Sequence, residues 1–203
     1  MIDLITPSYL PSISYIAWLI KKKIIYFDLT DKYNKQTYRN RAEIYGANGK
    51  LILTVPIIHI KKKHQLTKDV KIYYDKNWQN NHWKSICSAY RSSPYFEFYE
   101  EDFFKFYFEI NEKSLFDFNI RLMSKILSLI NHPFKYKTKC FNKKNHKKIY
   151  TIINAKKTNF KTPKYNQVFS CKHGYINNLS ILDVLFNLGP DTMDYLKSIN
   201  TKF

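Results

Sequence analysis

The N-terminal part of the chain contains two short apolar runs on either side of a helical pattern. The runs are residues 2–5 and 24–29, and both suit strands that are buried on their two faces. The residues between them predict a helix over 12–22, preceded by the turn-prone stretch TPSYLPS. A strand, a helical crossover and a second strand are typical of a parallel pair in one sheet. The start of the chain therefore predicts an α/β fold.

A β-hairpin is predicted over residues 38–57. Its arms contain RNRAEIY and LILTVPI, and the tetrapeptide GANG between them includes Asn48-Gly49, a strong turn signal. Together with the strands at 2–5 and 24–29, this hairpin predicts a mixed sheet. The alternative architecture is α+β, in which the hairpin and the helices are segregated.

Helical periodicity and capping residues predict the elements that flank the sheet. Ser114 with Asp117, and Ser180 with Asp183, form capping-box patterns at the starts of two of these helices. The stretch 135–170 is rich in lysine and asparagine and weakly periodic, and predicts a long loop with a short strand or two. A length of 203 residues supports one domain over 1–203. Helices are expected over 78–92, 114–131 and 180–188, with a final helix after the Gly-Pro stop at 189–190.

The formal net charge is +18, from 34 Lys and Arg against 16 Asp and Glu. Such a charge is usually taken to indicate nucleic acid or an anionic membrane as the partner. The chain is also rich in Lys, Ile, Asn, Tyr and Phe, as expected for a coding sequence biased toward A and T, and its lysines are scattered along the sequence. Solvated lysines that replace other polar residues are therefore one explanation of the charge, and RNA binding is the other.

Several classes of protein are disfavoured by the sequence. No stretch approaches the roughly 20 apolar residues that a membrane span needs, and no basic segment precedes an apolar core at the start. Cys87, Cys140 and Cys171 are odd in number and far apart, which favours reduced thiols over a disulfide framework or a zinc site. We expect a cytoplasmic protein without a metal site. No Walker A or Rossmann motif is present, so the cofactor is unknown.

Residue types that such a codon bias disfavours are bunched rather than spread. Gly, Ala, Arg, Pro and Trp concentrate within 39–56 and 78–94, and more sparsely within 174–190. These three stretches are where a functional site is sought first.

Arg39 and Arg41 are candidates for anion binding. Alternation in the first hairpin arm places both on one strand face, about 6 to 7 Å apart, with Lys35 beyond them if the strand begins early. A guanidinium grips phosphate or carboxylate bidentately, which an ammonium does not. The two arginines form a cradle for an anion on this interpretation. On the alternative one, they pair with Glu43 and other carboxylates on an exposed sheet face.

Tyr9 and Asp28 are candidates because of their places in the predicted strand–helix–strand unit. Tyr9 lies in the loop before the first helix, and Asp28 lies at the carboxyl end of the second strand. Nucleotide-binding α/β enzymes hold phosphate at this position, near the first helix N-terminus. Any parallel strand pair has the same layout, so a purely architectural explanation stays open.

Two histidines are candidate catalytic bases. His82 lies beside the apolar stripe of the helix predicted over 78–92, and His173 lies in a loop next to Gly174. Imidazole is suited to general acid–base chemistry near neutral pH. For His82, a half-buried packing role is the alternative.

Five motifs occur in order along the chain: TPSYLPS, KQTYRNR, GANGKLILTVPI, WQNNHWKSICSAYRSSPYFEFY and QVFSCKHGYINNLSILDVLFNLGP. In this order and spacing they resemble the WbqC-like protein family, from about residue 7 to 196, with a poor stretch at 135–160. One departure is Thr6, which stands where many members have glutamine, so no role of that side chain is carried over.

The resemblance implies a function only in outline. Family members occur in bacterial gene clusters for surface polysaccharide (O-antigen), and a glycine transferase activity has been proposed for them. Aminoacyl transfer needs an activated donor such as an adenylate, a thioester or an aminoacylated RNA, all of which contain phosphate. The expectation is a cytoplasmic group-transfer enzyme with a phosphate-bearing small-molecule donor, in which Arg39 and Arg41 suit the phosphate. The alternative is a non-catalytic RNA-binding or assembly protein that uses exposed Tyr, Phe and Lys.

Overall fold

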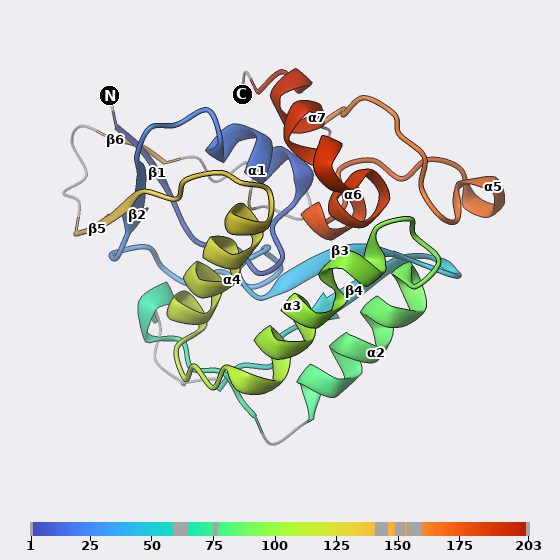
Figure 1. Cartoon of the computed structure of the whole chain (residues 1–203). Coiled ribbons are helices and arrows are strands. Elements are labelled where there is room, and N and C mark those ends of the chain that lie inside the picture. Colours follow the sequence, from blue (N-terminus) through green and yellow to red (C-terminus); the bar gives the residue numbers. More distant parts are fainter. Residues whose placement is uncertain are drawn as a thin grey trace.

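A parallel sheet of four short strands lies at one end of the molecule (Figure 1). The computed structural model describes residues 2–58, 65–74, 77–140, 146–148, 153 and 160–201. The strand order is β5-β2-β1-β6, and each neighbouring pair is parallel. The strands are β1 (Ile2–Ile5), β2 (Ile25–Asp28), β5 (Tyr136–Lys139) and β6 (His146–Lys148).

Helix α1 (Ile13–Leu19) is the crossover between β1 and β2. Ser12 caps it, because the Ser12 side chain accepts a hydrogen bond from the Tyr15 amide at 3.4 Å. All residues of α1 are buried, so the helix is part of the core rather than an amphipathic cover. The strand–helix–strand unit predicted from the sequence is confirmed.

The hairpin consists of β3 (Arg41–Gly46) and β4 (Gly49–Thr54). Glu43 is opposite Ile52, and Gly49 closes the turn with a φ of +96°, a conformation that glycine adopts without strain. The α/β class is confirmed, with parallel and antiparallel pairing both present. The hairpin forms a two-stranded sheet of its own instead of extending the parallel sheet.

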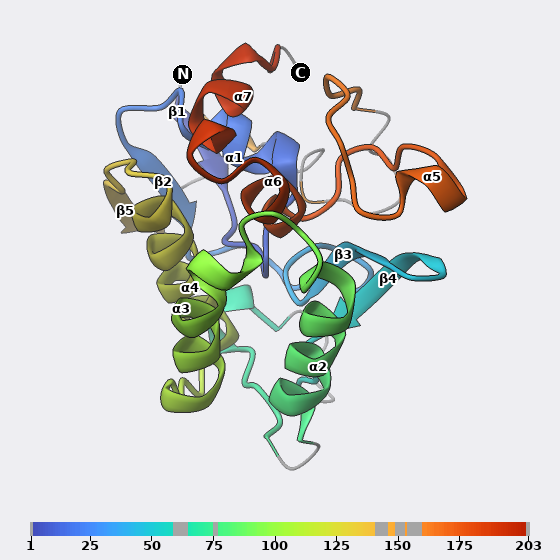
Figure 2. The ribbon, with the colours of Figure 1, turned by 45° about the vertical axis from the view of Figure 1, so that its right-hand side comes forward.

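Helices pack on both sides of this hairpin. Figure 2 shows α1, α6 and α7 on one side of β3 and β4, and α2 and α3 on the other. The backbone amide of Ser180 donates to the Glu43 carbonyl at 2.7 Å, which fixes the start of α6 against β3. The main helices are α2 (Trp78–Tyr90), α3 (Phe96–Glu109), α4 (Leu115–Leu129), α6 (Ile181–Leu188) and α7 (Thr192–Ser198); the short ones are η1 (Thr67–Asp69), α5 (Ser170–His173) and η3 (Gly189–Asp191).

The predicted helix starts are confirmed at their capping residues. Ser114 Oγ accepts from the Asp117 amide at 3.2 Å, and Ser180 Oγ accepts from the Leu182 amide at 3.3 Å. The Asp183 side chain is buried and accepts instead from Gln167 Nε2 at 2.8 Å. Asp183 therefore fastens the preceding segment to α6, in addition to lying in its first turn.

Strands β5 and β6 come from the stretch that was expected to be a loop with one or two short strands. All four side chains of β5 are exposed, so the strand has no hydrophobic pattern and is held by backbone pairing with β2.

One cluster of buried apolar side chains extends from Ile5 to Ile199 and joins the elements into one core. No helix in the described ranges has the length and apolarity of a membrane span. The three cysteines are free thiols.

Candidate functional site

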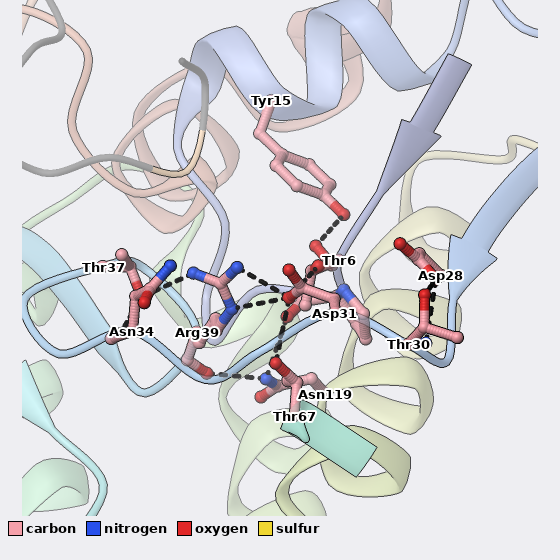
Figure 3. Close-up of polar contacts among 11 residues, drawn as sticks. Thr6, Tyr15, Asp28, Thr30, Asp31, Asn34, Thr37, Arg39, Thr67 and Asn119 are labelled. Carbon is pink, nitrogen blue, oxygen red and sulfur yellow. Dashed lines mark hydrogen bonds and ion pairs between the residues drawn. The ribbon is translucent and has the colours of Figure 1, made fainter. Parts of the chain in front are cut away.

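A buried ion pair between Arg39 and Asp31 lies beyond the carboxyl ends of β1 and β2 (Figure 3). The Arg39 side chain is 1% exposed and that of Asp31 is 2% exposed. Arg39 Nε and Nη2 both donate to Asp31 Oδ2, at 3.1 and 2.6 Å, and Nη1 donates to Thr37 Oγ1 at 3.0 Å. All three guanidinium nitrogens of Arg39 therefore donate hydrogen bonds to groups inside the protein.

The same carboxylate oxygen of Asp31 accepts hydrogen bonds from two hydroxyl groups. Thr6 Oγ1, directly after β1, donates to it at 2.7 Å, and Thr67 Oγ1, on η1, donates at 2.9 Å. Asn119 Nδ2 of α4 donates to the Arg39 carbonyl at 2.7 Å. The network thus connects four separate parts of the chain, as Figure 3 shows. Thr6, the residue at which the sequence departs from the family pattern, is one of its members.

Arg39 and Arg41 do not form the two-arginine cradle. Strand β3 begins at Arg41, so Arg39 lies in the preceding turn and its side chain is directed to Asp31 rather than along a strand face. Arg41 is half-buried, and Lys35 is exposed in the loop. Glu43, the alternative partner, pairs with Lys50 at 3.1 Å. A role for Arg39, Arg41 or Lys35 in anion binding stays a prediction.

Tyr9, His82 and Tyr107 form a second buried polar cluster. The Tyr9 hydroxyl lies 2.8 Å from His82 Nδ1 and 2.5 Å from the Tyr107 hydroxyl. The three residues come from the loop after β1, from α2 and from α3. Trp78 meets the His82 ring edge-on at 5.1 Å, and Phe118 stacks on Tyr9 at 6.2 Å. Two of the predicted site residues, Tyr9 and His82, are therefore brought together.

Burial lowers the pKa of His82 from 6.5 to about 4, so the ring is neutral near pH 7. A hydrogen bond with the Thr54 backbone opposes this shift, which means that the imidazole donates and the Thr54 carbonyl accepts. Because a neutral imidazole has one N–H group, and that group is directed to Thr54, Nδ1 accepts a hydrogen bond from the Tyr9 hydroxyl. Both ring nitrogens are thus engaged inside the protein. This geometry is sufficient for a packing role, and a catalytic role stays a prediction.

Asp28 lies next to the first cluster, since the Asp31 amide donates to the Asp28 carbonyl at 3.4 Å, whereas His173 lies elsewhere. Asp28 ends β2, and its Oδ1 accepts from the Thr30 amide at 2.8 Å and from the Thr30 hydroxyl at 2.5 Å. His173 is exposed on α5, and its Nε2 lies 2.9 Å from the Ala47 carbonyl in the hairpin turn. His173 is consequently next to the turn of the hairpin, whereas Asp28 is at the parallel sheet.

Two adjoining cavities open along the outer side of α2, and we call them together the α2 groove. The first, of about 370 Å³, lies between the hairpin turn and the helix, and the second, of about 720 Å³, extends along the helix. They share Lys84 and Ser88. The first is lined by residues 46–51 with Lys84, Ser85, Ser88 and Ala89, and the second by Asn80, Trp83, Lys84, Cys87, Ser88, Arg91 and Ser92.

The charged residues of the groove are cations: Lys50, Lys84 and Arg91. None of the described residues that line it is acidic. Lys50 pairs with Glu43 at 3.1 Å, and Arg91 pairs with Glu100 at 3.5 Å, and both cations have exposed side chains. Lys84 is exposed and makes no ion pair with any part of the chain that the structure describes. The charged lining residues of the groove are therefore all cations, and Lys84 is the one among them without an ion pair in the described ranges.

Sequence reasoning did not select Lys84, Ser85 or Ser88, since each resembles an ordinary exposed helix residue. The one sequence signal that could have found them is the concentration of scarce residue types within 39–56 and 78–94, because the groove lies between these two stretches. Small residues of the first bunch form the hairpin turn, and Ala89 of the second forms the facing part of α2. Small side chains at both places leave the space that the first cavity occupies.

Metal ligation has no candidate site among the residues described. No three His, Cys, Asp or Glu side chains in those ranges are placed so that they could hold a metal ion. The chemistry available in the groove is that of ammonium, guanidinium, hydroxyl and amide groups.

Comparison with known families agrees with the motifs quoted above. The model of the WbqC-like protein family matches residues 6–157 and 142–195. No significant match was found among curated proteins or solved structures. The chain belongs to the WbqC-like protein family.

Proposed function

We propose that this protein is a group-transfer enzyme that binds a phosphate-bearing donor in the α2 groove. The observation that supports the proposal is the combination of Lys50, Lys84 and Arg91 around two cavities with no acidic side chain in their described lining. Cavities of this size are typical of small-molecule sites. A phosphate group is the ligand that this set of cations favours most.

The hairpin turn adds backbone groups to the same cavity. Residues 46–51 pass along its wall, so main-chain amides of a tight turn are available to a phosphate together with the hydroxyl of Ser88. Ser85 is less available, since its hydroxyl already donates to the Asn81 carbonyl at 2.8 Å. The donor phosphate is expected nearest to Lys84, which both cavities share.

Family membership suggests which group is transferred. An aminoacyl group such as glycyl, moved from an activated donor to a precursor of a surface polysaccharide, is consistent with the proposals made for the family. In such a reaction, a nucleophile of the acceptor attacks the acyl carbon and the phosphate-bearing part leaves with the bonding electron pair. The free thiols of Cys87, Cys140 and Cys171 agree with a cytoplasmic location.

RNA binding through exposed aromatic residues is less well supported. Among the residues that the structure describes, the most exposed phenylalanine is Phe98 at 76%, which lies on α3 with Phe104 and Phe108. The sequence of α3, FEFYEEDFFKFYFE, contains five acidic residues and one lysine. A negatively charged helix repels a phosphate backbone, so these aromatic side chains are poorly placed for stacking with RNA bases.

The test is binding of inorganic pyrophosphate to the full-length chain, measured by calorimetry, with Lys84→Gln as the test variant. We expect Lys84→Gln to weaken binding by about 1.5 to 3 kcal/mol, the range for a hydrogen bond to a charged group. Lys105→Gln makes the same change on the exposed side of α3, where Lys105 pairs with Glu101, and should bind like wild type.

Two outcomes would count against the proposal. Equal affinity of the wild type and Lys84→Gln would mean that the groove is not the phosphate site. Tight binding of random RNA with a steep negative salt dependence, and no binding of pyrophosphate, would favour the RNA-binding alternative.

A further inference from the structure

The two cavities of the α2 groove differ in chemical character. The first is bounded by backbone of the hairpin turn and by ammonium and hydroxyl groups. The second is bounded by an indole ring, a guanidinium and a carboxamide, from Trp83, Arg91 and Asn80. The groups of the first cavity suit phosphate, whereas those of the second suit a flat ring that has hydrogen-bonding groups on its edge.

Trp83 is held firmly at the wall of the second cavity. Phe96 stacks on its ring at 6.2 Å with an interplanar angle of 26°, and Phe104 meets it edge-on at 5.9 Å. Trp83 is 9% exposed, so only a small part of the indole faces the groove. A rigid aromatic edge of this kind can contact a planar ligand without losing side-chain entropy on binding.

Arg91 and Asn80 lie on the same side of α2 as Trp83, one at each end of the cavity. The Arg91 side chain is 71% exposed, makes a long ion pair to Glu100 at 3.5 Å and hydrogen-bonds the Cys87 side chain, so its guanidinium lies at the wall of the cavity. A planar guanidinium stacks well on aromatic rings. The Asn80 amide offers both a donor and an acceptor to a ring edge.

We infer that the donor is a nucleotide whose diphosphate occupies the first cavity and whose base occupies the second, between Trp83 and the Arg91 guanidinium. This inference rests on the proposed function, because it assigns a chemical class to the phosphate-bearing donor. Lys84, shared by the two cavities, lies at the junction of the diphosphate and the nucleoside.

The experiment compares ADP, UDP, pyrophosphate, adenosine and uridine by calorimetry on the full-length protein at fixed ionic strength. ADP or UDP is expected to bind at least tenfold more tightly than pyrophosphate, and the nucleosides most weakly. Arg91→Lys keeps the charge but loses the planar guanidinium, so it should lower the affinity for ADP or UDP by a larger factor than the affinity for pyrophosphate. Arg121→Lys, at an exposed arginine of α4 paired with Glu112, is the matched control and should change neither affinity.

Tryptophan fluorescence supplies a second measurement. The chain has three tryptophans, and Trp18 and Trp78 are buried at 4% and 3% exposure, so Trp83 is the tryptophan that lines the groove. A nucleotide should change its emission, whereas pyrophosphate should not.

The outcomes separate the two proposals. Equal affinity for ADP, UDP and pyrophosphate, with Lys84→Gln weakening all three, would overturn the nucleotide class and leave the phosphate-bearing donor in place. Failure of all the phosphate ligands to bind would overturn both. Binding of a nucleoside as tightly as its diphosphate would also overturn the inference, because the first cavity would then contribute nothing.

Discussion

Arg39 and Lys84 represent two opposite uses of a cation in one strongly basic chain. Arg39 is buried, and its guanidinium donates two hydrogen bonds to Asp31 and one to Thr37. Lys84 is exposed, lines both cavities of the α2 groove and has no ion pair among the described residues. The first cation has its anion inside the fold, whereas the second is available for an anion from outside.

This difference explains why arginine is found at position 39. Three donors of one rigid plane converge on the Asp31 carboxylate and the Thr37 hydroxyl, which the single ammonium of a lysine cannot reproduce. Replacing one partner of a buried pair leaves the other charge without compensation, whereas replacing an exposed cation leaves water in its place. Substitutions at the two places should therefore separate stability from ligand binding.

The largest effect is expected for Arg39→Leu, which should lower the free energy of unfolding by about 3 to 5 kcal/mol, because the Asp31 carboxylate stays buried without the guanidinium that compensates its charge. Arg39→Lys should also destabilise, since it keeps the charge but loses most of the hydrogen bonds. Urea unfolding followed by circular dichroism measures both. If Arg39→Lys unfolds at the wild-type midpoint, the internal pairing is not what arginine provides here.

An acid-dependent loss of stability is expected from His82. Its pKa is 6.5 in the unfolded chain and about 4 in the folded one, so between these values the unfolded state binds more protons. The contribution of His82 is complete above pH 6.5 and is lost as the pH falls toward 4, to a total of about 3 kcal/mol. Urea midpoints of the wild type and His82→Gln, measured from pH 7 to 4, give the difference that belongs to His82. Parallel curves for the two proteins would contradict the prediction.

Tyr9→Phe tests the second buried cluster and should cost about 1 to 3 kcal/mol, because it leaves His82 Nδ1 without its donor and removes the partner of Tyr107. The aromatic packing is retained, so the loss reports on the hydroxyl alone. Tyr136→Phe, at an exposed tyrosine of β5, serves as the control and should stay within about 0.5 kcal/mol of wild type. If Tyr9→Phe and Tyr136→Phe melt at the same temperature, the Tyr9 hydroxyl makes no net contribution to the free energy of unfolding.

The smallest effect on stability is expected in the groove. Lys84→Gln should change the free energy of unfolding by less than about 0.5 kcal/mol, since the side chain is exposed and has no ion pair in the described ranges. Lys50→Gln, which breaks the pair with Glu43, should cost no more than about 1 kcal/mol. Thermal melts of the two variants beside Arg39→Lys complete the comparison. A strong destabilisation by Lys84→Gln would assign the groove lysine a structural role.

Much of the fold could be predicted because local signals agreed with the tertiary structure. Ser114 and Ser180 cap helices where the sequence indicates, and the Asn48-Gly49 turn closes the hairpin. The position of β5 could not be predicted, because its side chains are all exposed and only backbone pairing with β2 holds it. The separation of the hairpin from the parallel sheet likewise depends on long-range packing and has no local pattern.

The candidate site was predicted less well than the fold. Tyr9 and His82 were selected from the sequence and do lie in contact, but their polar groups hydrogen-bond to each other and to other groups inside the protein. Alternation placed Arg39 and Arg41 on one strand face, yet β3 starts two residues after Arg39, and the guanidinium pairs with Asp31, eight residues earlier in the chain. Lys84 had no signal of its own, because an exposed helix lysine has the same pattern whether or not a cavity lies beside it.

The order of strands in the parallel sheet has a consequence for how the chain acquires its structure. Strands β1 and β2 pair early in the sequence, but their other edges pair with β6 and β5, where Ile2 is opposite His146 and Ile25 is opposite Tyr136. During synthesis, both edges of the first pair are therefore open until most of the chain has been made. Contacts this distant along the chain slow folding, because a long loop must close before they form. Refolding should accordingly be limited by completion of this small sheet, and an N-terminal fragment that ends before β5 should be prone to aggregate through the open strand edges.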